Sequence, residues 1–214
     1  MQYLFLSIFF IATAIHLYAS LKRNQHLRNL TKPFILPALL GFYVFAADKV
    51  MPAVVLALVF SWLGDVLLMK HGTKWFAAGG IAFFVGHVFF VLSYLPYISF
   101  PGLSPVFIIL LAVFFTAVVS FIFSKLRPHL PGKLFWPMFA YLLVNGAMNC
   151  FAIYRLASNP CAAAVITCVG AILFFISDSS LFFVRFNKNG RLKTHFLVML
   201  TYSVGELLII LGLL

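Results

Sequence analysis

The chain has 214 residues, of which 64% are hydrophobic and only 9% are charged, a composition that excludes a water-soluble globular domain. Its formal net charge is +11, but the Lys and Arg residues are dispersed over short connections, with no long basic stretch. This dispersal excludes a nucleic-acid-binding protein and favours anionic membrane lipids as partners. We therefore predict one membrane-embedded domain over residues 1–214.

Charged residues and Pro or Gly clusters divide the chain into apolar segments of about 20 residues, the length that spans a bilayer as a helix. We predict an all-α fold, a polytopic membrane bundle of eight transmembrane helices. In chain order the segments are Gln2–Ser20, Pro33–Ala47, Met51–Met69, Trp75–Leu95, Ser104–Ser124, Leu134–Tyr154, Cys161–Phe183 and His195–Leu214. The second segment is short, so it crosses with little tilt, thins the bilayer locally, or is not a separate span.

The Lys and Arg residues alternate between the two sides that eight helices define. The first, third, fifth and seventh connections hold 13 of them, whereas the second, fourth and sixth hold only Lys49 and Arg155. The seventh connection contains Arg185, Lys188, Arg191 and Lys193. Because basic connections stay on the cytoplasmic side, we expect both termini on the non-cytoplasmic side. We expect the protein in the bacterial inner (cytoplasmic) membrane.

The chain contains four acidic residues, and three of them fall inside predicted spans: Asp65, Asp178 and Glu206. The fourth, Asp48, is adjacent to Lys49 and is expected in a solvated outer connection. A charged side chain at the centre of a bilayer costs at least about 2.5 to 3.5 kcal/mol, so an embedded acid usually faces a polar interior and has a function. The three embedded acids are therefore the first candidates for a functional site.

Asp65 and Asp178 are predicted at similar depth near the cytoplasmic face. Asp65 lies four residues before Met69, and Asp178 lies five before Phe183, at the ends of two helices that run inward. At a rise of 1.5 Å per residue, each carboxyl lies roughly 6 to 8 Å inside its helix end. The two can meet in one cavity if their helices pack together. The alternative is a structural carboxyl, bonded to a helix end or to a neighbouring Lys.

Other polar residues recur at helical spacing near these levels. Tyr141, Asn145 and Asn149 form a stripe at every fourth position, and Tyr202 precedes Glu206 by four. Such stripes indicate either a polar groove or hydrogen bonds between helices, worth about 0.6 kcal/mol per pair. His87 lies deep in a Phe-rich segment, where it is either a hydrogen-bonded core residue or part of a site.

Arg185 follows Asp178 by seven residues on the same helix face, where it can bind a lipid phosphate. It can equally be an ordinary cytoplasmic anchor of its helix.

The order of these motifs resembles a known family. Gly64-Asp65, Gly86-His87, Ser177-Asp178 followed by Leu181, and Tyr202 with Glu206 together resemble the YhhN-like lysoplasmalogenase family, best from Ser61 to Leu214. Lys32-Pro33 is also similar to the family's pattern, whereas Glu206 departs from it, because a Gln is expected there in many relatives.

The resemblance implies an alkenyl ether hydrolase of the membrane. Such an enzyme cleaves the vinyl ether bond of a lysoplasmalogen, a lysophospholipid, to a fatty aldehyde and a glycerophospho-base, and needs neither a metal nor an organic cofactor. It does not imply an oligomeric state or a headgroup preference.

The predicted acids suit this chemistry. A vinyl ether is hydrolysed by protonation of the carbon beta to the oxygen, which gives an oxocarbenium ion that water captures. Two carboxyls in one low-dielectric cavity, one protonated and one ionised, can supply the acid and the base, as glycosidases do by analogy. We predict Asp65 and Asp178 as this catalytic pair. Residues expected to contact the substrate are His87, Tyr141, Asn145, Tyr202, Glu206 and Arg185.

Two other functions fit the same acids. A Zn²⁺ ion bound by Asp65, Asp178, Glu206 and His87 can hydrolyse a lipid amide or ester, although no HxxxH or HExxH motif is present. A proton-coupled transporter can use buried acids as a relay and move a lipid or another solute without cleaving it. No inverted repeat is evident in the sequence to support the transporter.

Overall fold

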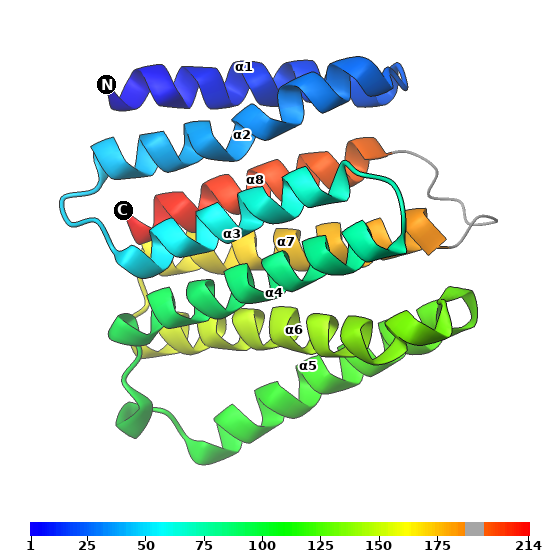
Figure 1. The fold of residues 1–214 in the computed structure, drawn as a ribbon. Helices are drawn as coiled ribbons and strands as arrows, with labels where there is room; N and C mark the ends of the chain where they lie inside the picture. Colours follow the sequence, from blue (N-terminus) through cyan, green and yellow to red (C-terminus); the bar gives the residue numbers. More distant parts are fainter. Residues whose placement is uncertain (187–194) are drawn as a thin grey trace.

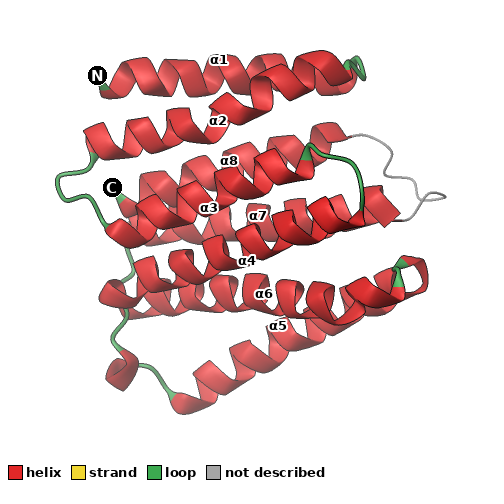
Figure 2. Cartoon of the chain, in the orientation of Figure 1, coloured by secondary structure: helices red, strands yellow, loops and turns green. Residues whose placement is uncertain are grey.

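The computed structural model describes residues 1–186 and 195–214, and these residues form an all-helical bundle with no β-strand (Figure 2). The α-helices are α1 (Gln2–Leu21), α2 (Gln25–Ala46), α3 (Pro52–Leu68), α4 (Thr73–Tyr94), α5 (Pro105–Leu126), α6 (Phe135–Ser158), α7 (Ala162–Phe186) and α8 (His195–Leu213). Short 3₁₀ turns occupy the α4–α5 and α5–α6 connections. The prediction of an all-α bundle is confirmed.

Successive helices run antiparallel, so the connections alternate between the two ends of the bundle (Figure 1). The pairs with the most extensive contact are α1 with α2, α3 with α4, and α7 with α8, while α6 packs on α4, α5 and α7. Helices α1 and α5 form opposite edges of the bundle (Figure 1). Both termini lie at one end, together with the α2–α3 connection, and which side of the membrane this end faces stays a prediction.

Seven of the described helices are long and apolar enough to cross a membrane, by length and composition. The exception is α3, an apolar helix of 17 residues. The second segment, predicted to be short, is instead a helix of 22 residues, so that boundary was wrong. The helix begins eight residues before Pro33 because Asn24 caps it, with its side chain accepting a hydrogen bond of 3.1 Å from the Leu27 N–H.

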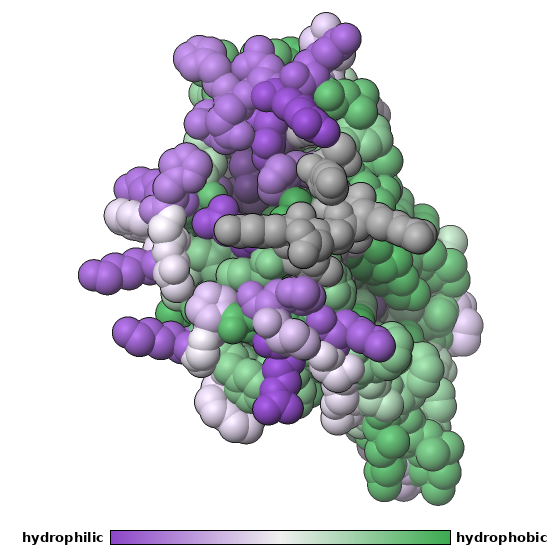
Figure 3. All heavy atoms as spheres, turned by 90° about the vertical axis from the view of Figure 1, so that its right-hand side faces the viewer, coloured by the Kyte–Doolittle hydropathy of each residue, from purple (hydrophilic) through white to green (hydrophobic). Residues whose placement is uncertain are grey.

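The basic residues of the first, third and fifth connections gather at the end of the bundle opposite the termini, where hydrophilic side chains cluster (Figure 3). Arg185, in the last turn of α7, lies at the same end. The other predicted basic residues of the seventh connection, Lys188, Arg191 and Lys193, lie outside the described residues. At the opposite end, Asp48 and Lys49 are exposed in the α2–α3 connection, as predicted.

Arg155 does not lie in a connection, as the sequence suggested, but inside α6. The helix continues to Ser158, and the guanidinium is buried, donating hydrogen bonds of 2.7 Å to Thr167 Oγ1 and 2.6 Å to the Gly212 carbonyl. Because α7 and α8 supply these acceptors, the charge does not have to reach water. Arg155 therefore ties three helices together.

Small residues let α7 and α8 approach closely. A Cβ atom at Gly170 would lie 2.7 Å from the Gly205 carbonyl oxygen, and one at Gly205 would lie 2.9 Å from that of Gly170. Close approach through glycine is typical of helix pairs in membranes. The contact fixes the pair of helices that carries Asp178 and Tyr202.

Candidate functional site

Asp65 and Asp178 line one cavity of about 100 Å³ at the basic end of the bundle. Both are almost fully buried, with relative exposures of 3% and 4%. The cavity is bounded by α1, α2, α3, α4, α7 and α8, and we call it the acid cavity. Its lining comprises His16, Arg28, Lys32, Asp65, Leu68, Phe76, Phe83, Ser177, Asp178, Leu181, Arg185, His195, Val198, Met199 and Tyr202.

Asp65 is held by one partner on each oxygen. Lys32 Nζ lies 2.9 Å from Oδ1, and the Tyr202 hydroxyl donates a hydrogen bond of 2.9 Å to Oδ2. Lys32 comes from α2 and Tyr202 from α8, so the carboxyl of α3 is fixed from two sides. The ion pair corresponds to the structural alternative raised from the sequence, but both of its residues face the acid cavity.

Asp178 receives its polar contacts on a single oxygen. The Tyr141 hydroxyl donates a hydrogen bond to Oδ2, and Asn145 Nδ2 donates another of 2.8 Å to the same atom. His87 Nε2 lies 3.4 Å from it, in contact but not aligned as a hydrogen bond. No hydrogen bond among residues 1–186 and 195–214 uses Oδ1, the second oxygen of this acid.

The His87 ring constrains where a proton can lie in this group. Its Nδ1 is 2.6 Å from the Phe83 carbonyl oxygen, so Nδ1 carries a hydrogen and donates it. In a neutral ring Nε2 then carries no hydrogen, and it lies 3.4 Å from Asp178 Oδ2.

Basic side chains surround the acid cavity beside Lys32. Arg28, Arg185 and His195 all line it, and the Arg185 guanidinium lies 5.7 Å from the centre of the Phe76 ring. His16 also lines it, with Nδ1 3.0 Å from Thr31 Oγ1. This cluster of donors suits an anion such as a phosphate diester.

Sequence reasoning missed Lys32, Arg28, His16 and His195 as site residues. The start predicted for the second segment, Pro33, left Arg28 and Lys32 in a connection. A helix that begins at Gln25 instead places them four residues apart, on one face. Asn24 as an N-cap before this run was the signal that could have found them.

The remaining polar residues singled out in the sequence differ in whether they reach the two aspartates. Tyr141, Asn145 and His87 contact Asp178, whereas Asn149 bonds back to the Asn145 carbonyl at 2.9 Å and does not reach the acid. Glu206 is fully buried but does not line the acid cavity, because it lies one turn deeper than Tyr202. Its carboxyl oxygens have no hydrogen-bond partner within the described part of the chain.

The donors proposed for a zinc ion do not converge. Within the described ranges, no group of three or more His, Cys, Asp or Glu side chains has an arrangement that could hold a metal ion. Asp65 and Asp178 line the acid cavity, whereas His87 and Glu206 do not, although His87 Nε2 lies 3.4 Å from Asp178 Oδ2. The arrangement of ligands therefore does not support the zinc alternative.

Comparison with known proteins gives one match. The model of the YhhN family matches residues 27–213, from the first turn of α2 to the end of α8. No curated protein and no solved structure matches the chain.

Proposed function

The chain belongs to the YhhN family, the family of lysoplasmalogenases, and from this premise we propose that it hydrolyses the vinyl ether bond of lysoplasmalogens inside the membrane. Family membership and the long apolar helices support a membrane hydrolase. The observation that carries the finer proposal is the acid cavity, in which the two embedded aspartates face one space beneath a cluster of cations.

We assign the acid to Asp178. Its Oδ2 already accepts hydrogen bonds from Tyr141 and Asn145, so a proton on Oδ1 leaves both contacts intact. In the first step this proton goes to the carbon of the vinyl ether beta to the oxygen. The double bond supplies the electron pair, and an oxocarbenium ion forms beside the Asp178 carboxylate.

We assign the base to Asp65, whose ion pair with Lys32 suits a carboxylate. Asp65 removes a proton from a water molecule as its oxygen attacks the oxocarbenium carbon, which gives a hemiacetal. In the last step Asp178 takes the hemiacetal hydroxyl proton, while Asp65 returns its proton to the leaving ether oxygen. The carbon–oxygen bond breaks, the aldehyde and the alcohol leave, and both acids regain their starting states.

The cationic side chains that line the acid cavity would bind the headgroup of the lipid. Arg28 and Arg185 would hold the phosphate of the lipid, since guanidinium groups bind phosphate oxygens in pairs. A headgroup there places the vinyl ether deeper, toward the two carboxyls. Because the basic connections lie at this end, we expect the acid cavity to open toward the cytoplasmic side of the membrane.

Purified protein incubated with a lysoplasmalogen in D₂O tests the mechanism. We expect a fatty aldehyde that carries one deuterium on the carbon next to the carbonyl, because the acid delivers its proton to that carbon. Asp65→Asn and Asp178→Asn should each abolish aldehyde release while the protein remains folded and extractable. Aldehyde release by either variant at the rate of the unchanged protein would reject the assignment.

The same assay separates the alternatives. A transporter would move the lipid across vesicles without releasing aldehyde. A zinc enzyme would lose activity on chelation and regain it with the metal, whereas the proposed mechanism predicts no effect of a chelator.

A further inference from the structure

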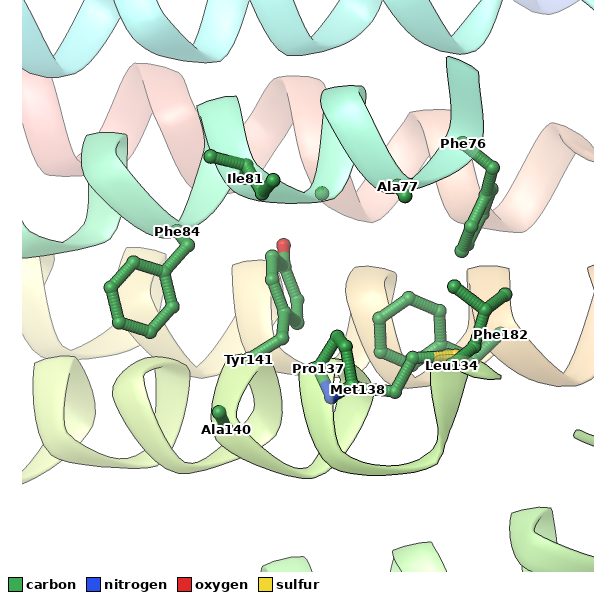
Figure 4. A pocket seen from close by; sticks show the side chains of 11 residues that line it. Phe76, Ala77, Ile81, Phe84, Leu134, Pro137, Met138, Ala140, Tyr141 and Phe182 are labelled. Carbon is green, nitrogen blue, oxygen red and sulfur yellow. The ribbon is translucent and has the colours of Figure 1, made fainter. Parts of the chain in front are cut away.

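A second hollow lies between α4 and α6, and its character is the opposite of that of the acid cavity. It has a volume of about 190 Å³ and is lined almost entirely by hydrocarbon. Phe84 and Ala77 of α4 lie across it from Pro137 and Met138 of α6 (Figure 4). We call it the apolar groove.

A thin aromatic wall separates the apolar groove from the acid cavity. Phe76 lines both spaces. Phe182 lines the groove and packs edge-on against Phe76 and Tyr141, at ring-centre distances of 6.2 and 5.3 Å. Tyr141 lines the groove with its ring, while its hydroxyl donates to Asp178. The acid therefore lies directly behind the wall.

Three other apolar hollows of the bundle lack this connection. One lies between α2 and α3, and two lie along α5 and α6. None shares a lining residue with the acid cavity. The wall that it shares with the acid cavity thus distinguishes the apolar groove from ordinary gaps that membrane lipid fills.

We propose that the apolar groove binds the hydrocarbon chain of the substrate, which enters sideways from the bilayer between α4 and α6. This inference rests on the proposed function. With the phosphate among the cations of the acid cavity and the chain in the groove, the vinyl ether lies at the aromatic wall, next to Asp178. For one lipid to occupy both spaces, the Phe76 ring, which lines both of them, has to move aside.

The groove acts by positioning the lipid. A hydrocarbon chain gains little by leaving the bilayer for an apolar protein surface, because lipid tails are equally apolar. Holding the chain instead fixes the height and direction of the double bond relative to Asp178. A misplacement of about 1 Å costs up to roughly 100-fold in rate, so a filled groove should affect turnover more than binding of the headgroup.

Gly80 offers a substitution that fills the groove without disturbing the fold. It lines the groove, and a Cβ atom added there meets no atom within 4 Å. Leu also favours a helix over Gly by several tenths of a kcal/mol. Ala112→Leu is the matched control, since Ala112 is exposed and lines one of the unconnected hollows.

The test uses a lysophosphatidylethanolamine analogue with an uncleavable saturated ether and a photoreactive diazirine in mid-chain. We expect crosslinks within residues 76–84 and 134–141, which are lost in Gly80→Leu, because its side chain fills the groove, and are unchanged in Ala112→Leu. Crosslinks that lie elsewhere, are absent, or persist in Gly80→Leu would overturn the inference.

Aldehyde release from a lysoplasmalogen, measured in parallel, keeps the two proposals apart. Without aldehyde from the unchanged protein the proposed function fails, yet the crosslinks still decide whether the groove binds a lipid chain. Aldehyde release combined with crosslinks outside α4 and α6 would reject the groove alone.

Discussion

Removal of the Tyr141 hydroxyl should slow the chemical step without changing the shape of the site. Tyr141→Phe keeps the ring that lines the apolar groove and deletes only the hydrogen bond to Asp178 Oδ2. Asn145, whose Nδ2 lies 2.8 Å from the same oxygen, still holds the carboxyl in place. The substitution therefore isolates one contact of the proposed acid.

The expected magnitude follows from the charge on Asp178. As Asp178 gives its proton to the substrate it becomes a carboxylate, and a hydrogen bond to a charged group contributes about 1.5 to 3 kcal/mol. Because this bond strengthens in the transition state, its loss should lower kcat rather than raise KM. At about 1.36 kcal/mol per factor of ten, the decrease in kcat is roughly 10- to 150-fold.

The assay is the initial rate of aldehyde release in detergent or vesicles, over a range of lysoplasmalogen concentrations. Tyr154→Phe is the matched control, because its hydroxyl donates to the Ile108 carbonyl at 2.9 Å, away from the acid cavity. Unchanged kcat in Tyr141→Phe, or an equal loss in Tyr154→Phe, would refute the argument that this hydroxyl stabilises Asp178 during proton transfer.

Three further predictions address the base, the fold and the topology. Lys32→Met should decrease aldehyde release and lower the midpoint of thermal unfolding, because it leaves the buried Asp65 carboxylate without its ion-pair partner. Lys22→Met, at an exposed position, should change neither quantity. Arg155→Met should lower the thermal midpoint measured in detergent, since two hydrogen bonds of a charged group, each worth about 1.5 to 3 kcal/mol, are lost; an unchanged midpoint would show that Arg155 does not tie α6 to its neighbours. Single-cysteine variants test the orientation with a membrane-impermeant thiol reagent. Lys70→Cys should react only from the cytoplasmic side, and Lys49→Cys only from the other side. The reverse pattern would show that the predicted orientation is inverted.

The polar stripe on α6 shows what the spacing of residues in the sequence can predict and what it leaves open. The spacing of Tyr141, Asn145 and Asn149 predicts one shared helix face, and that face is buried. Spacing leaves open whether they line a groove or bond to one another. The structure divides them: Tyr141 and Asn145 contact Asp178, while Asn149 turns back to its own helix. The choice depends on how α6 is rotated against α7, which no local pattern encodes.

The amino-acid sequence by itself determined that the chain lies in a membrane, that it forms helices, and which few acidic residues lie inside them. In hydrocarbon the backbone N–H and C=O groups cannot bond to water and must bond to one another. Long apolar segments therefore predict helices without any knowledge of tertiary contacts. Burying a charge in hydrocarbon is costly, so the position of Asp65 and Asp178 within apolar segments is enough to identify them as candidate functional residues.

Only the tertiary structure decided the partners of those acids. Lys32 reaches Asp65 from α2, Tyr141 reaches Asp178 from α6, and Glu206 stays one turn too deep to join them. A hydrogen bond or an ion pair forms only within about 3 to 4 Å, and this distance depends on how the helices pack and rotate against one another. Helix packing, set by contacts between residues far apart in the chain, therefore brings Asp65 and Asp178 to one cavity.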